Sequence, residues 1–382
     1  MLISLQVSKS SLIYLLLIFT PIAIALEFIN TDHIVIFVVA SVALIPLAKL
    51  IGDSTEHLSV HYGATLGSLL NVTFGNAAEI IIAIVAINAG LIDLVKASIT
   101  GAILGNILLI FGLSILAGGI RYKEQYFSQE NVGLQSSMLF LAIIGLAIPT
   151  ILVNTLNVDG TNTSIENQSN IQLLSDILAF LLLAIYIAGI IFTFFTHKHL
   201  FLTQSPFDHK KDQKEEGRVK EQGHSSSTTS WSKRKSFVFL GLSMAGVIAI
   251  SEILVGSVEV TAKQFGFGEL FVGAIIIGIV GNAAEHSSAI VLARKGKIEL
   301  SIGIAAGSGT QIALFVVPIL VIAGILMNQP FSLVFTLFEL VTIFLAAIIL
   351  NLISRDGKSN WFEGILLTFV YVIIAIGFFF IK

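Results

Sequence analysis

The sequence contains about eleven apolar runs, each near the roughly 20 helical residues that cross a hydrocarbon core. They lie near 12–29, 33–51, 60–90, 94–118, 131–153, 171–196, 236–258, 268–293, 298–325, 331–353 and 361–381. The third run is too long for one straight span, so we expect it to tilt, break or begin at the interface. The pattern predicts an all-α polytopic membrane protein with about eleven transmembrane helices.

The composition supports this class and excludes several others. Of the 382 residues, 55% are hydrophobic and 12% charged, whereas a soluble domain has roughly 25% charged residues. The net charge of −3 does not indicate a basic surface that would bind nucleic acid. The absence of cysteine excludes disulfides and thiolate sites. The eight histidines lack the His-Glu-x-x-His spacing of a helical zinc site, which disfavours a zinc hydrolase. The spans also show no nucleophile–base pair or catalytic metal constellation, so we do not expect an enzyme.

The loops predict an orientation, because Lys and Arg beside membrane helices favour the cytoplasm. Basic residues gather after the fourth, sixth, eighth and tenth runs, and the other loops hold only isolated lysines such as Lys96 and Lys263. This places the N-terminus in the cytoplasm and the C-terminus outside. The longest loop has the composition of a solvated linker. A regulatory role for it, such as gathering cations, stays open.

One pentapeptide occurs twice. Gly75-Asn76-Ala77-Ala78-Glu79 returns 206 residues later as Gly281-Asn282-Ala283-Ala284-Glu285, and Gly67 matches Gly273 at the same shift. In the following span, Asn106 stands against Gln311 at a shift of 205. Each copy falls in a half of five spans, and an odd number of spans inverts the second half. The predicted parts are therefore a first helix (1–30), a five-helix repeat (31–197), a linker (198–235) and an inverted five-helix repeat (236–382).

Both copies place a carboxylate inside an apolar run. Charges there are costly and usually mark an ion or proton path. Asn76 and Glu79, like Asn282 and Glu285, are three residues apart and share a helical face. Transporters built from inverted repeats bind their substrate where the repeats meet. We therefore predict that these four side chains form the binding site.

A glycine precedes each polar pair. Gly75 and Gly281 allow a close backbone approach or a local break that frees carbonyl oxygens. The alternative is plain helix packing, for which membrane helices also use glycine.

Paired carboxylates and amides are hard oxygen ligands, which suit Ca²⁺, Mn²⁺ or Mg²⁺. Burial and repulsion between like charges favour the protonated form of a carboxyl group. The same pair could therefore hold one divalent cation or about two protons, which is a physical basis for exchange. The alternative is two protonated carboxyl groups that only pack between helices.

The paired pentapeptides, Gly105-Asn106 and the run from Ser308 to Phe315 resemble the calcium/proton exchanger (CAX) family of the cation/Ca²⁺ exchanger superfamily. The resemblance covers the chain from the second span onward. It implies one peripheral helix plus two inverted five-helix repeats, and export of Ca²⁺ from the cytosol in exchange for protons. By position, it implies a central acidic pair with amides around it: Glu79, Glu285, Asn76, Asn282, Asn106 and Gln311.

Sodium/calcium exchangers of this superfamily usually have a proline before the repeat glutamate. Ala78 and Ala284 stand there in this chain, which favours proton coupling. A sodium-coupled exchanger, an exchanger preferring Mn²⁺ and a cation channel remain as alternatives. Ca²⁺ and protons would then be substrates rather than cofactors, and no other cofactor is expected.

Four further residues have two interpretations each. Glu56 and Glu259 could guide cations along the vestibules, or could be solvated or paired charges at helix ends. His286 could tune protonation near pH 6.5, or serve packing and hydrogen bonding. Glu339, deep in the tenth run, could carry protons or form structural hydrogen bonds.

The expected partners are Ca²⁺, protons and the lipid bilayer, and a homo-oligomer stays open. The short loops favour a prokaryotic plasma membrane, with a vacuolar membrane as the alternative.

Overall fold

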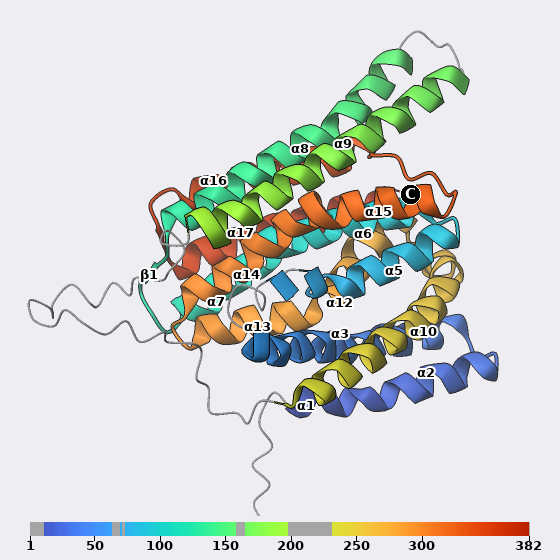
Figure 1. The fold of residues 1–382 in the computed structure, drawn as a ribbon, viewed down its shortest axis with the longest axis horizontal. Coiled ribbons are helices and arrows are strands. Elements are labelled where there is room, and N and C mark those ends of the chain that lie inside the picture. The colour runs from blue at the N-terminus through green and yellow to red at the C-terminus, as the bar shows by residue number, and fades with distance from the viewer. Residues whose placement is uncertain (1–10, 63–68, 71–72, 158–164, 198–230, 382) are drawn as a thin grey trace, which may run out of the picture.

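The structure is a computed structural model that describes residues 11–62, 69–70, 73–157, 165–197 and 231–381. Gly67 and most of the predicted linker, residues 198–230, lie outside the described residues. The described chain is a bundle of helices (Figure 1). The predicted helical membrane class is confirmed.

The first half begins with three short helical segments, which precede the long helix α3. Its elements are α1 (Ser11–Tyr14), η1 (Leu15–Ile18), α2 (Phe19–Phe28), α3 (His33–Tyr62), α5 (Ala77–Asn88), α6 (Ile92–Leu104), η2 (Gly105–Ile110), α7 (Phe111–Gly119), β1 (Gln125–Tyr126), α8 (Gln129–Asn157), α9 (Ile165–Ile191) and η3 (Phe192–Thr196).

The second half runs from α10 to α17. Its elements are α10 (Lys233–Phe265), α11 (Glu269–Phe271), η6 (Val272–Ile277), α12 (Gly278–Gly281), α13 (Ala283–Arg294), α14 (Ile298–Gln311), η7 (Ile312–Val316), α15 (Val317–Leu326), α16 (Leu337–Ser354), β2 (Lys358–Ser359) and α17 (Trp361–Phe380). The π-helical segments η2 and η7 hold corresponding places, each inside the span that follows the pentapeptide.

Eight helices within the described residues are long and apolar enough to cross a membrane. A bent pair, Glu269–Gly281 with Ala283–Arg294, raises the number to nine if it forms one span. Two shorter apolar helices, Leu15–Phe28 and Ala77–Asn88, stand where the first and third runs were expected. The count of eleven, like the four-part division of the chain, stays a prediction.

Two predicted spans have different bounds in the structure. The second was expected to end at residue 51, but α3 continues to Tyr62. The charges in this continuation do not oppose a helix there, because Asp53 pairs with Lys49 at 3.0 Å, one turn earlier, and Glu56 is exposed. The tenth was expected to begin at 331, but α16 begins at Leu337.

The segment before α16 is extended although it is apolar. Phe331, Leu333 and Phe335 are buried. The hydroxyl of Ser175 accepts from the backbone N–H of Leu333, and the hydroxyl of Thr150 accepts from that of Phe335. Because buried N–H groups need a partner, these hydroxyls allow a non-helical chain to lie inside the protein.

The helices pack around two apolar cores. The smaller core joins α2, α3, α5 and α10, with α3 lying along α10. The larger core joins α6 and α7 with α14 to α17 and with α8 and α9. In Figure 1, α3 and α10 form one side of the bundle, α8 and α9 form the opposite side, and α6 and α14 lie between them.

Corresponding helices pack across the two halves. Helix α17 packs on α7, and α9, its counterpart, packs on α15, the counterpart of α7. Helix α16 packs on its own counterpart, α8. This reciprocity fits the predicted inverted repeat.

Three of the predicted basic loops lie at one end of the bundle. Strand β1, after α7, pairs antiparallel with β2, after α16. Tyr122, in the first of these loops, lies against Gly296, which follows α13. The loops after the predicted fourth, eighth and tenth spans therefore share one end, as the distribution of Lys and Arg predicts.

Candidate cation-binding site

Both copies of the pentapeptide interrupt a helix at the asparagine. Helix α12 ends at Gly281 and α13 begins at Ala283, with a bend of 60° between the two parts of this span. In the first half, residues 75 and 76 form a turn directly before α5. Asn76 has φ −96° and ψ 17°, and Asn282 has φ −93° and ψ 3°. The two breaks thus share one backbone conformation.

Each break starts a new helix, and the glutamate lies in its first turn. Glu79 is in the first turn of α5, and Glu285 is in the first turn of α13. The N-terminal end of a helix carries partial positive charge, which favours a carboxylate there. The structure therefore gives both glutamates the same local setting.

The side-chain amides form two matching contacts between the halves. Nδ2 of Asn76 donates to Oε1 of Gln311 at 3.0 Å, and Nδ2 of Asn106 donates to Oδ1 of Asn282 at 3.3 Å. Asn76 corresponds to Asn282, and Gln311 to Asn106. Each contact thus joins the break of one half to the following span of the other.

Several buried oxygen atoms of this cluster have no hydrogen-bond partner among the described residues: Oε2 of Glu79, Oδ1 of Asn76 and Oδ1 of Asn106. Asn76 and Asn106 are 1% and 0% exposed. Buried polar atoms are normally hydrogen-bonded, so each exception needs an explanation. Orphaned carboxylate and amide oxygens are the donor set of a hard cation.

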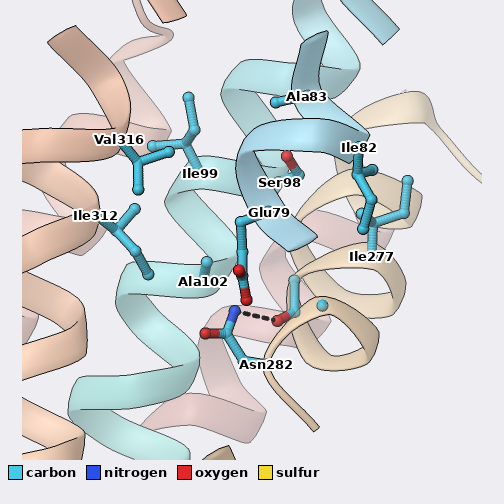
Figure 2. Close-up of a pocket in the computed structure, with 12 residues that line it drawn as sticks. Glu79, Ile82, Ala83, Ser98, Ile99, Ala102, Ile277, Asn282, Ile312 and Val316 are labelled. Carbon is cyan, nitrogen blue, oxygen red and sulfur yellow. Dashed lines mark hydrogen bonds between the residues drawn. The ribbon is translucent and has the colours of Figure 1, made fainter. Parts of the chain in front are cut away.

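Glu79 lines a small cavity. Its free volume is about 20 Å³, enough for roughly one water molecule. Figure 2 shows the Glu79 side chain pointing toward Asn282, whose Nδ2 donates to the carbonyl of Gly278 at 3.1 Å. A Cβ at Gly281 would lie 3.5 Å from Oε1 of Glu79. The glycine therefore leaves free the space next to the carboxylate.

Glu285 lies near this cavity but does not line it. Its Oε2 accepts a hydrogen bond from Oγ of Ser308 at 2.6 Å. Within the described residues, no three His, Asp or Glu side chains cluster closely enough to hold a metal ion. A cation at this site would need amide and carbonyl oxygens in addition to the two carboxylates.

The remaining candidates divide between the cluster and the periphery. His286 is buried next to Gly105, and its Nε2 has no partner among the described residues. Glu56 is exposed on α3. Glu259 is exposed and pairs with Lys263 at 2.6 Å, one turn away on α10. The structure does not bring Glu56 or Glu259 to the cluster.

Glu339 requires a correction. It was expected deep within a span, but it lies in the first turn of α16, because the chain before Leu337 is not helical. Its carboxylate accepts from the backbone and the hydroxyl of Thr336, which caps the same helix. These hydrogen bonds fit the structural interpretation of Glu339, and the proton-carrying one stays a prediction.

Two residues near the site were missed in the sequence. Ser98 lines the cavity from α6, and Thr100 of the same helix donates to Glu339 at 3.3 Å. Neither has a distinctive motif. Their only signal is their place in the span that also carries Asn106.

The fold and the cluster together indicate which class of protein this is. The chain has helices of membrane length, two matching helix breaks and buried carboxylates between its two halves. These are the features of an ion-transporting membrane protein.

The chain belongs to the sodium/calcium exchanger protein family, which matches residues 33–195 and 235–380. This confirms the resemblance carried by the paired pentapeptides. The Ca(2+)/H(+) antiporter of Aphanothece halophytica is 40% identical over 378 residues, covering 98% of each chain. The Ca(2+)/H(+) antiporter ChaA of Bacillus subtilis is 39% identical over 360 residues, or 94% of this chain and 96% of that one. The structure of native YfkE, 37% identical, superposes with a TM-score of 0.77 over 96% of this chain and 99% of that one.

Proposed function

We propose that this chain is a Ca²⁺/H⁺ antiporter that binds its two substrates in turn at Glu79 and Glu285. Similarity over the full length to two antiporters of that kind supports the substrates. The observation that carries the site is the set of buried oxygens without partners: Oε2 of Glu79 and Oδ1 of Asn76 and Asn106.

A buried carboxylate without a counter-charge is costly, so it takes up a cation or a proton. Two carboxylates match the charge of one Ca²⁺, which prefers about six to eight oxygen ligands. Glu79 and Glu285 supply up to four of them. The orphaned amide oxygens, backbone carbonyls at the two breaks and water supply the rest.

The hydrogen bond from Ser308 has a place in this cycle. The hydroxyl occupies one lone pair of Glu285 in the described conformation. We expect a bound cation to draw Glu285 toward Glu79, because both carboxylates then ligate the same charge. Ser308 then holds the second carboxylate ready until a cation arrives.

Coupling follows from the cost of an empty site. The conformational change that moves access from one side to the other is favourable only when the carboxylates are neutralised by Ca²⁺ or protons. The breaks at Asn76 and Asn282 let the helical pieces on either side of the cluster move separately. Proton entry thereby drives Ca²⁺ export.

We place the protein in a prokaryotic plasma membrane. The end of the bundle that carries the loops after α7, α13 and α16 then faces the cytoplasm, because these loops hold Arg121, Lys295 and Arg355. In this orientation the N-terminus lies inside and the C-terminus outside. Protons that enter down their gradient then drive Ca²⁺ out of the cytosol.

The test is transport by the purified protein in proteoliposomes. We expect ⁴⁵Ca²⁺ to accumulate only when a proton gradient is imposed, and to be lost when a protonophore is added. Unlabelled Mn²⁺ added as a competitor measures the preference between the cations. Accumulation driven by a Na⁺ gradient alone, or Ca²⁺ flux without any proton movement, would contradict the proposal.

A further inference from the structure

A second group of buried charges lies on α6, outside the cluster described above. Lys96 was expected in a loop, but it is part of α6 and only 8% exposed. Its Nζ lies 5.9 Å from the centre of the Phe331 ring. No hydrogen bond or ion pair of Lys96 is present within the described residues. Its acidic neighbours are Asp93, three residues earlier on α6, and Glu339, which contacts Thr100 one turn later on the same helix.

Of the two carboxylates near Lys96, Glu339 is the buried one. It is 1% exposed, whereas Asp93 is exposed to solvent. One carboxylate oxygen accepts from the backbone N–H and the hydroxyl of Thr336, each at 2.8 Å. The other accepts from Thr100, which is fully buried on α6, at 3.3 Å. Glu339 is thereby held at a fixed place beside α6.

The same helix supplies part of the wall around Glu79. Ser98, Ile99 and Ala102 of α6 line the cavity. At a rise of about 1.5 Å per residue, Lys96 lies roughly 3 to 9 Å from them along the helix axis. Buried charges are screened much less than exposed ones. The charge of Lys96 therefore acts on any cation that occupies the cavity.

We propose that Glu339 is the counter-charge of Lys96, and that together they set the affinity of the Glu79 cavity for its cation. While both groups are charged, their effects at the cavity largely cancel. When Glu339 loses its charge, Lys96 remains and repels the cation. Neither residue touches the cation, so both are positioning residues. This inference rests on the proposed Ca²⁺ binding.

The competing explanation is purely structural. Glu339 would cap α16, and Lys96 would only fill space next to Phe331. A buried ion pair can often be replaced by apolar residues without loss of stability, so a structural role alone gives no reason to keep the lysine. The two explanations differ in what a second substitution does.

The experiment compares Glu339→Gln, Lys96→Met and the double variant. Glutamine serves in a capping box as glutamate does, so Glu339→Gln removes the charge and largely keeps the cap. We expect the apparent KM for Ca²⁺ in proton-driven ⁴⁵Ca²⁺ uptake to rise about three- to tenfold in Glu339→Gln and to fall in Lys96→Met. The double variant should return to within about twofold of the wild type. Ser243→Ala, which removes a buried hydroxyl on α10 that bonds only to carbonyls of its own helix, removes no charge; it serves as the control and should leave KM unchanged.

A KM that stays raised in the double variant would show that Glu339 acts through the cap and would overturn the inference. An unchanged KM in Lys96→Met, a substitution that suits apolar surroundings, would overturn it as well. Equilibrium binding of ⁴⁵Ca²⁺ to the detergent-purified variants separates this inference from the proposed exchange. In that binding experiment we expect Glu339→Gln to bind Ca²⁺ more weakly than the wild type and Lys96→Met to bind it more tightly, even if the protein exchanges no protons. If the affinities do not follow this order, the proposed role of the Lys96–Glu339 charge pair is refuted.

Discussion

The side-chain amide of Asn106 donates a hydrogen bond of 3.3 Å to Oδ1 of Asn282, at the break between α12 and α13. The counterparts of these residues, Gln311 and Asn76, are also joined, but there Asn76 at the break donates to Oε1 of Gln311, at 3.0 Å. Each contact thus joins a central amide of one half to a central amide of the other. If one half moves relative to the other, both contacts must change. We therefore expect these contacts to change when access to Glu79 moves from one side of the membrane to the other.

Substitution Glu79→Gln should abolish proton-driven Ca²⁺ uptake. Glutamine keeps the shape of the side chain but removes a charge that would balance the buried cation, and the loss of one buried partner typically costs several kcal/mol. We expect the uptake rate to fall about a hundredfold or more in proteoliposomes. Glu259→Gln is the control, because Glu259 is exposed and pairs only with Lys263 among the described residues. Normal uptake by the Glu79 variant would remove this residue from the site.

Substitution of Gly281 should reduce Ca²⁺ binding in proportion to the size of the new side chain. A Cβ there would lie 3.5 Å from Oε1 of Glu79, an ordinary contact, so alanine fits but takes up space beside the carboxylate. We expect a moderate rise in KM for Gly281→Ala and loss of Ca²⁺ binding for Gly281→Val.

Gly256→Ala is the matched control for this series, since nothing lies within 4 Å of a Cβ at that position on α10. Equal effects at the two glycines would show that helix propensity, and not the space beside Glu79, is responsible.

The repeated pentapeptide made the centre of this protein predictable. Its spacing placed Asn76 and Glu79 on one face, and the 206-residue shift paired them with Asn282 and Glu285. The break at each asparagine was anticipated as one function of the preceding glycine. The direction of the Glu285 side chain was not predictable, because its hydrogen bond to Ser308 depends on the packing of α13 against α14.

Hydropathy misplaced two charged positions, for different reasons. Charged residues after position 51 resembled a loop, yet α3 accommodates Asp53 because it pairs with Lys49 one turn earlier on the same helix. Lys96 resembled a loop residue because the counter-charge proposed for it, Glu339, lies in the other half of the chain, where it contacts α6 through Thr100. A single sequence does not show which distant carboxylate offsets a buried lysine.

Substitution Ser308→Ala should lower the thermal stability of the purified protein in the absence of Ca²⁺. The hydroxyl donates to a buried carboxylate at 2.6 Å, and a hydrogen bond to a charged group contributes about 1.5–3 kcal/mol. Added Ca²⁺ should restore part of the loss, since a bound cation satisfies Glu285 in its place. Ser287→Ala, which removes only a bond to the carbonyl of Ala284, is the control. A larger Tm decrease in the control would contradict the assigned role of Ser308.

Substitutions at Thr150 and Ser175 should destabilise the protein without changing its affinity for Ca²⁺. Their hydroxyls accept from the buried backbone N–H groups of Phe335 and Leu333, at 2.9 and 3.0 Å. In Thr150→Val the shape is kept but the N–H of Phe335 loses its acceptor, which costs about 1–3 kcal/mol.

We expect Thr150→Val and Ser175→Ala each to lower the Tm, and the double variant to lower it by about the sum, because the two hydroxyls satisfy different N–H groups. Thr155→Val, on the exposed part of α8, should leave the Tm unchanged. The extended segment before α16 lies outside the cation cluster, so the KM for Ca²⁺ in proteoliposomes should stay at the wild-type value in all three single variants. A changed KM in Thr150→Val with an unchanged Tm would instead mean that this segment takes part in transport and is not held in place by the two hydroxyls.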